Sequence, residues 1–195
     1  MLFTVFRGET PQAIRLEGPR VYLVPPRMSD WKSWASLREE SRDFLTPWEP
    51  TWPHDALGRH AFRRRLKAYN QEWRQGTGFS FLVHRLHDDV LMGGVTLSNV
   101  RRGVAQTASM GYWIGERFCR QGFMTEAVCA VVEFAFEELA LHRVEAACLP
   151  HNDASRSLLL KVGFRQEGYA RQYLRINGKW QDHLLFEMLR DDPRL

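Results

Sequence analysis

Apolar residues recur along the chain with two different periods, and the change of period predicts where helices give way to strands. In the first third they recur at spacings of three and four, which is typical of amphipathic helices. Ser29-Asp30 supplies an N-cap for a first helix that runs to about Glu40. Asp55 caps a second helix that runs to about Gln75. An alternating segment at 20–24 predicts a short strand before both helices.

From residue 79 onward the period becomes two, which predicts β-strands joined by tight turns. Strands are expected at 79–84, 90–99 and 107–114. The turns between them, at Asp88-Asp89 and Arg102-Gly103, are short, so these strands form an antiparallel meander.

Helices and strands alternate in the last third of the chain. The expected elements are a helix at 125–139, a strand at 144–149, a helix at 153–162, and strands at 164–174 and 180–189 around an Asn177-Gly178 hairpin turn. A strand, a helix and a second strand in succession imply a locally parallel pair. Without a repeat or a low-complexity linker, the 195 residues predict one α/β domain over 1–195.

The composition is that of an ordinary soluble globular domain, with 44% apolar and 26% charged residues. No apolar run is long enough to span a membrane, and residues 1–9 lack the basic leader and cleavage site of a secretory signal. We therefore expect a cytoplasmic protein without membrane contact. Cys119, Cys129 and Cys148 are odd in number and lack metal-finger spacing, so neither a disulfide framework nor a metal site is expected. Cys129 and Cys148 lie on an apolar helix stripe and in an apolar strand, so buried thiols are expected there.

Arginine clusters at 63–65 and 101–102 contribute strongly to the net charge of +4. Such clusters attract polyanions, and both RNA and the phosphates of a cofactor qualify. A solvated helix face is the alternative for 63–65. Between the two predicted helices, residues 44–53 carry three prolines among aromatic side chains, which predicts a loop that covers another part of the molecule.

Two segments combine residue types that suit a phosphorylated cofactor. In the first, 120–127, Gly122 precedes a helix, so a pyrophosphate can approach the N–H groups of the first turn. Taken alone, Gly122 fits a structural glycine better than a phosphate site, since the segment belongs to neither a dinucleotide fingerprint nor a P-loop. In the second, 150–164, Asn152 and Ser155 stand at the start of a short helix, where one can face the cofactor while the other caps the helix.

Further matching pieces lie at 44–50, 98–100, 102–103, 111–112, Gly122 with Met124, 150–152, 167–170 and 177–183. In this order and at this separation they resemble the GCN5-related N-acetyltransferase (GNAT) family over nearly the whole chain. Within the family the chain is similar to the ribosomal-protein-alanine N-acetyltransferase branch, whose members acetylate the N-terminus of ribosomal protein S5.

The resemblance implies a GNAT fold, with a strongly twisted mixed sheet of about seven strands flanked by about four helices. The strand ending near Ile114 and the strand 144–149 splay apart and admit acetyl-CoA, with its pantetheine arm along the first strand. A backbone N–H near 110–114 would polarise the thioester carbonyl. The cofactor-binding residues implied are Tyr112, Trp113, Ile114, Arg117, Arg120, Gln121, Gly122, Phe123, Met124, Thr125, Asn152 and Ser155.

The tyrosine with which many family members protonate the departing thiolate falls at Leu159, which has no proton to donate. The resemblance therefore makes Ser155 the catalytic hydroxyl that protonates or hydrogen-bonds the sulfur, and Asn152 the residue that orients the pantetheine or a water. Cys119 stands where the family's phosphate loop often has Gln or Arg, so one side-chain contact is altered.

The general base has three candidates among the carboxylates. Glu49 lies on the aromatic loop that is expected to cover the acceptor channel, and Asp182 and Glu145 are the other options. An α-amino group with a pKa of about 8 is far easier to deprotonate than a lysine with a pKa of about 10.4, which favours an N-terminal acceptor.

The predicted reaction is direct acetyl transfer in a ternary complex with acetyl-CoA, without a covalent cysteine intermediate. The expected acceptor is the N-terminal alanine of a ribosomal protein. A small-molecule amine is one alternative acceptor. A ribosome-assembly or RNA-binding factor with the same fold is another, and a ribosome or rRNA contact is compatible with each.

Overall fold

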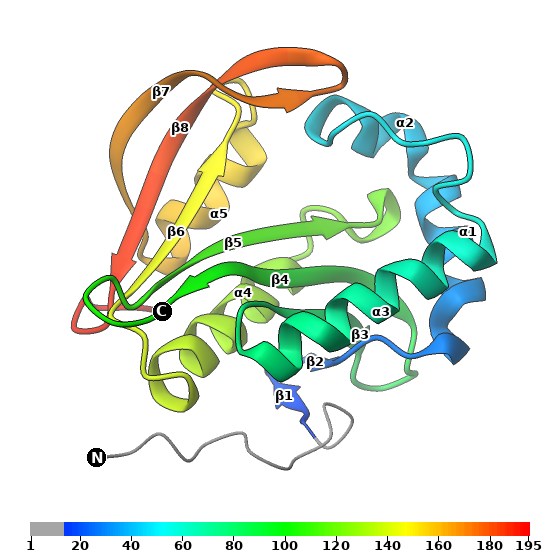
Figure 1. Cartoon of the computed structure of the whole chain (residues 1–195), viewed down its shortest axis with the longest axis horizontal. Helices are drawn as coiled ribbons and strands as arrows, with labels where there is room; N and C mark the ends of the chain where they lie inside the picture. The colour runs from blue at the N-terminus through cyan, green and yellow to red at the C-terminus, as the bar shows by residue number, and fades with distance from the viewer. Residues whose placement is uncertain (1–13) are drawn as a thin grey trace.

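The computed structural model describes residues 14–195, so the expectation about residues 1–9 lies outside the described part. The described residues form one mixed sheet of 8 strands in the order β1-β2-β3-β4-β5-β6-β8-β7, with helices packed against it (Figure 1). The predicted α/β fold with a mixed sheet is confirmed. No helix of this part of the chain combines the length and apolar character that a membrane span requires.

The N-terminal half of the sheet is antiparallel. Its strands are β1 (Leu16–Glu17), β2 (Val21–Val24), β3 (Phe79–Arg85), β4 (Leu91–Arg101) and β5 (Thr107–Ile114). Each strand pairs antiparallel with the next one along the chain, so the predicted meander is confirmed. In β3 all residues from Phe79 to Val83 are buried, which means that both faces of the sheet are covered here.

Helical segments connect β2 to β3. They are η2 (Met28–Asp30), α1 (Trp31–Glu40), α2 (Arg42–Leu45), η3 (Thr46–Trp48) and α3 (Arg59–Gln75). The helix expected after Ser29-Asp30 is confirmed. The loop expected at 44–53 is helical as far as Trp48, since Pro47 lies at the start of a 3-10 turn, where a missing N–H costs nothing.

The prediction that Asp55 caps the second long helix is wrong. Helix α3 begins at Arg59, with Gly58 in the N-cap position. The carboxylate of Asp55 instead forms an ion pair with Arg64 at 2.6 Å on the surface. An exposed carboxylate near a helix start can satisfy a neighbouring guanidinium as readily as the helix N–H groups, and the sequence does not distinguish these two partners.

The C-terminal half adds the parallel pair and a long hairpin. Its elements are η4 (Glu116–Phe118), α4 (Phe123–Glu133), the π-helical turn η5 (Phe134–Glu138), β6 (Arg143–Cys148), α5 (Asp153–Val162), β7 (Arg165–Ile176) and β8 (Lys179–Leu189). Strand β6 is parallel to β5, and β7 and β8 form the hairpin, as predicted. Helix α4 begins earlier than expected because Gly122, at φ 84°, allows the helix to start directly after it.

An aromatic cluster joins α3, β3 and η5. The ring of Trp73 lies edge-on to Phe79 and Phe81, with centroids 4.9 and 5.3 Å apart. Phe134 packs against the same two phenylalanine rings at 5.5 Å. Such pairs contribute about 0.5–1.5 kcal/mol each beyond their buried area. The cluster therefore holds α3 and the end of α4 firmly on the sheet.

Candidate active site

Strands β5 and β6 separate partway along their length, and this opens the sheet. They pair over Thr107–Met110 and Arg143–Ala146. Beyond these residues β5 stays with β4 as far as Ile114, whereas β6 stays with β8 as far as Cys148, and Figure 1 shows the two strands diverging. The predicted splay is confirmed. On the side of the opening, residues 111–114 of β5 have no partner strand, so their backbone N–H and C=O groups are available to a ligand.

The side chains of Tyr112 and Ser155 meet at this opening. Tyr112 belongs to the part of β5 beyond the split, and its hydroxyl lies 2.7 Å from Ser155 Oγ in the first turn of α5. The backbone N–H of Ser155 donates to Asn152 Oδ1 at 3.0 Å, so Asn152 is the N-cap of α5. The structure therefore brings Asn152 and Ser155 together, as expected, and uses the side-chain oxygen of Asn152 for capping.

Cys148, the last residue of β6, completes this polar cluster. Burial raises the pKa of its thiol, and the neighbouring side chain of Ser155 acts in the opposite direction. Burial also raises the pKa of Tyr112, although the hydrogen bond with Ser155 acts in the opposite direction. Both groups stay protonated near neutral pH, so the cluster offers hydrogen-bond donors and not a charged nucleophile.

The loop before α4 has the geometry of an anion site. Gly122 and Arg120 both have positive φ angles, 84° and 60°, and they turn the chain directly into the helix at Phe123. The N–H groups of the first turn have no acceptor inside a helix and carry its partial positive charge. The phosphate-binding segment predicted at 120–125 is thus a true helix N-terminus with a glycine at its entry.

The arginines predicted to bind phosphate differ in their surroundings. Arg117 forms an ion pair with Glu40 at 3.2 Å, and its backbone carbonyl accepts from Gln121 Nε2 at 2.8 Å. The side chain of Arg117 is still 57% exposed. Arg120 is exposed, and the described residues include no ion pair to it. Both guanidinium groups are therefore accessible to an anion, Arg120 without competition and Arg117 in competition with Glu40.

Arg20, which the sequence analysis did not single out, stabilises the loop that precedes α4. Its guanidinium binds Glu126 of α4, with Nε 2.6 Å from Oε1, and donates through Nη2 to the carbonyl of Gln121 at 3.0 Å. It also lies over the ring of Phe123, 4.6 Å from the centroid. An arginine at the start of a strand carries no local sign of such a role, because its partners are about a hundred residues away along the chain.

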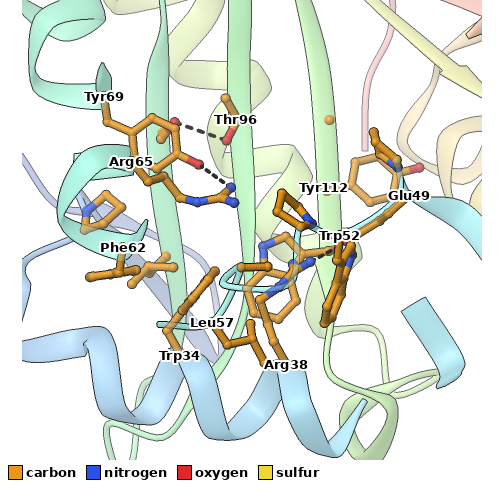
Figure 2. A pocket seen from close by; sticks show the side chains of 18 of the residues that line it. Trp34, Arg38, Glu49, Trp52, Leu57, Phe62, Arg65, Tyr69, Thr96 and Tyr112 are labelled. Atoms are coloured by element: carbon orange, nitrogen blue, oxygen red, sulfur yellow. Dashed lines mark hydrogen bonds and ion pairs between the residues drawn. The ribbon is translucent and has the colours of Figure 1, made fainter. Parts of the chain in front are cut away.

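A pocket of about 390 Å³ borders β5 beside the split (Figure 2). Its walls come from α1, α3, the segment 49–57 and strands β3 to β5. Aromatic and cationic side chains make up nearly half of the lining, and they include Trp34, Arg38, Trp52, Phe62, Arg65, Tyr69, Tyr112 and Trp113. Tyr112 thus belongs both to this pocket and to the cluster at the opening of the sheet.

Arg38 and Glu49 form an ion pair at the edge of this pocket (Figure 2). Arg38 is only 8% exposed, and its guanidinium lies over the rings of Trp52 and Trp113, 4.4 and 4.8 Å from their centroids. Trp52 Nε1 donates to the same carboxylate oxygen, Oε2 of Glu49, at 2.7 Å. The other oxygen, Oε1, has no hydrogen-bond partner among residues 14–195. The aromatic loop therefore covers the pocket, as expected, and a buried arginine that the sequence did not reveal holds it there.

Of the three carboxylates considered as general base, Glu49 is the one that lines the pocket. Glu145 lies on β6 before the split and binds Arg143 at 3.0 Å. Asp182 accepts from the Tyr169 hydroxyl at 2.5 Å and from a backbone N–H, and these hydrogen bonds lower the pKa of Asp182. The position of Glu49 in the pocket therefore favours this residue over Glu145 and Asp182 as the general base. No group of three or more metal-ligating side chains occurs in the described part of the chain.

Comparison with known proteins identifies the family. Residues 20–165 match the model of the acetyltransferase (GNAT) domain. The chain is 36% identical to the probable N-acetyltransferase YjcK of Bacillus subtilis (strain 168), over 91% of this chain and 98% of that protein. It is 34% identical to the ribosomal protein uS5-alanine N-acetyltransferase of Escherichia coli (strain K12), over 96% of each. The chain therefore belongs to the GNAT family and is an acetyltransferase.

A solved structure agrees with this assignment. Mycobacterium smegmatis RimJ, determined in complex with CoA-disulfide, superposes with a TM-score of 0.83 at 33% sequence identity. The match covers 90% of this chain and 86% of that one. The chain thus shares its fold with a protein whose structure was determined in complex with a coenzyme A derivative.

Proposed function

We propose that the protein transfers the acetyl group of acetyl-CoA to the N-terminal α-amino group of a protein that begins with alanine, with ribosomal protein uS5 as the substrate. The observation that carries this proposal is the junction at Tyr112, where the opening in the sheet meets the aromatic pocket. A thioester in the opening and an amine in the pocket are adjacent at this residue, as direct transfer requires. The uS5-alanine N-acetyltransferase among the relatives supports the choice of acceptor.

The residues at the opening fit acetyl-CoA. The unpaired edge of β5 suits the amide groups of a pantetheine arm. A Cβ at Gly111 would meet no atom within 4 Å, so the face of the strand is also open at this residue. The start of α4 at Gly122 suits the pyrophosphate, with Arg117 and Arg120 beside it. In this proposal Ser155 donates a hydrogen bond to the sulfur. A backbone N–H of β5 near the split would polarise the carbonyl.

The pocket suits a neutral amine more than a polycation. Its carboxylate, Glu49, is already paired with the buried guanidinium of Arg38, and Arg65 is a second cation on the wall. A polyamine would bring further positive charges to these arginines without a free anion to hold them. An α-amino group with a pKa of about 8 reaches its neutral form easily, and Oε1 of Glu49 can accept its proton directly or through a water.

The test is acetylation of an alanine-initiated peptide with the sequence of the uS5 N-terminus. We expect kcat/KM for this peptide to rise about tenfold per pH unit up to about pH 8 and then to level, because the free α-amine must lose its proton. An N-terminally blocked peptide with one lysine and a polyamine serve as competing acceptors. Preferential acetylation of either of these, or unchanged uS5 modification in cells without the gene, contradicts the proposal.

Ser155→Ala is expected to lower kcat about thirtyfold with little change in the KM for acetyl-CoA, because it removes a hydrogen bond that matters most when the sulfur becomes charged. Steady-state kinetics with the alanine-initiated peptide measures both constants. Ser157→Ala is the matched control, since Ser157 is exposed on the same helix. A Ser155→Ala enzyme with wild-type kcat would show that the serine does not act on the leaving group.

A further inference from the structure

We propose that Tyr112 is a positioning residue for Ser155: its hydroxyl donates to Ser155 Oγ and thereby aims the serine proton at the sulfur of coenzyme A as the thiolate departs. This inference rests on the proposed function, and it assigns a task to the side chain of Tyr112 beyond the cofactor contact of its backbone. No other tyrosine of residues 14–195 is hydrogen-bonded to Ser155.

The direction of the hydrogen bond between Tyr112 and Ser155 follows from the number of protons that each hydroxyl can donate. A serine hydroxyl has one proton to donate and can accept two hydrogen bonds. Among residues 14–195, the hydrogen-bonded side-chain partner of Ser155 Oγ is the Tyr112 hydroxyl, at 2.7 Å. If the serine proton points to a sulfur, the bond to Tyr112 must be donated by the tyrosine.

The Tyr112 hydroxyl is suited to donate a hydrogen bond and not to transfer its proton. Burial raises the pKa of Tyr112, so its hydroxyl remains a donor throughout the working pH range of the enzyme. A thiol has a pKa of about 8.5, so complete proton transfer from such a tyrosine to the thiolate is uphill. The pair Tyr112–Ser155 therefore stabilises the departing thiolate by hydrogen bonding, and the final proton reaches the sulfur from solvent after transfer.

The backbone fixes both partners. Tyr112 is paired with Val95 in the ladder between β4 and β5, and Ser155 is held by the cap of Asn152. Leu159, at the position where many family members have a tyrosine, is fully buried in α5. The hydroxyl that α5 lacks at Leu159 is thus supplied by Tyr112 of β5.

The test compares Tyr112→Phe, Ser155→Ala and the double variant with the wild type. The ring is kept in Tyr112→Phe, so only the hydroxyl is lost. We expect Tyr112→Phe to lower kcat about fivefold to tenfold at unchanged KM for acetyl-CoA. The effect is expected to vanish when Ser155 is already alanine, because Tyr112 acts through that serine.

A second measurement does not depend on the acceptor. The thiol of bound coenzyme A is titrated by the ultraviolet absorbance of its thiolate, with the protein saturated by CoA alone. We expect the pKa of the bound thiol to be higher in Tyr112→Phe than in the wild type, because the thiolate loses part of its hydrogen bonding. Tyr22→Phe is the matched control, since Tyr22 is also buried and donates to Asp89 at 2.9 Å on another part of the sheet.

The outcomes separate the two proposals. A wild-type pKa of the bound thiol in Tyr112→Phe, or losses in kcat that multiply in the double variant, overturn the role of Tyr112 and leave the acetyltransfer to an N-terminal amine intact. Thiol titrations that behave as expected, together with no acetylation of the alanine-initiated peptide, overturn the acceptor and support the role of Tyr112. A protein that does not bind CoA overturns both.

Discussion

Gly122→Val is expected to weaken the binding of CoA about a hundredfold. Gly122 adopts φ 84°, and a side chain in this region costs about 1–3 kcal/mol, so the variant loop relaxes to another conformation and must regain the strained one to bind. A Cβ at this position would also lie 3.0 Å from Nη2 of Arg20, which supports the loop. Isothermal titration with CoA measures the change in Kd.

Gly76→Val is the control for backbone strain alone. Gly76 has a similar φ of 67° at the end of α3, and a Cβ there would meet no atom within 4 Å. We expect this variant to lose stability with no change in the Kd for CoA. Equal Kd values for wild type and Gly122→Val would mean that the start of α4 does not bind the pyrophosphate.

Arg38→Met is expected to destabilise the folded protein by about 3 kcal/mol. The substitution leaves the carboxylate of Glu49 partly buried with Trp52 as its remaining partner, and removing one member of a buried ion pair strands the other charge. For a chain of this length the expected fall in Tm is about 6–12 °C. Urea unfolding followed by circular dichroism measures the change in free energy.

Two further variants make this prediction specific. Adding Glu49→Gln to Arg38→Met is expected to recover part of the lost stability, because the carboxylate that Arg38→Met leaves without its guanidinium is then removed. Arg64→Met breaks the exposed ion pair with Asp55 and is expected to change the free energy of unfolding by less than about 1 kcal/mol. A loss in Arg38→Met no larger than in Arg64→Met would show that the pair does not hold the aromatic loop.

The bounds of helices and strands could be predicted from the sequence where a local pattern of residues determines them. Helix α5 spans Asp153–Val162 as expected, since Asn152 caps its start and Gly163 ends it with a left-handed conformation. The same reasoning was wrong at Asp55, whose side chain binds an arginine one turn into the helix. Local rules state which backbone conformations a residue favours, whereas a side chain with several possible partners takes the one that the fold brings near.

The candidate site was predicted as two segments, and only the folded chain shows how their side chains interact. Gly122 and Asn152 could be singled out because a helix start has a local signature. The support from Arg20 and the ion pair of Arg38 had no such signature. The sequence around an arginine does not reveal whether its guanidinium is solvated or is buried against tryptophan rings.

The sequence by itself determined the order of the longer helices and strands, the antiparallel meander, the parallel pair and the helix starts of the two segments proposed to bind the cofactor, because each depends on periodicity or on short-range backbone geometry. Tertiary structure alone decided which side chains meet at the opening of the sheet. The contact between Tyr112 and Ser155 joins residues 43 positions apart, and it forms because β5 and β6 part beyond Met110. The physical reason is that side-chain contacts depend on how strands pair and separate in space, which no local pattern of residues specifies.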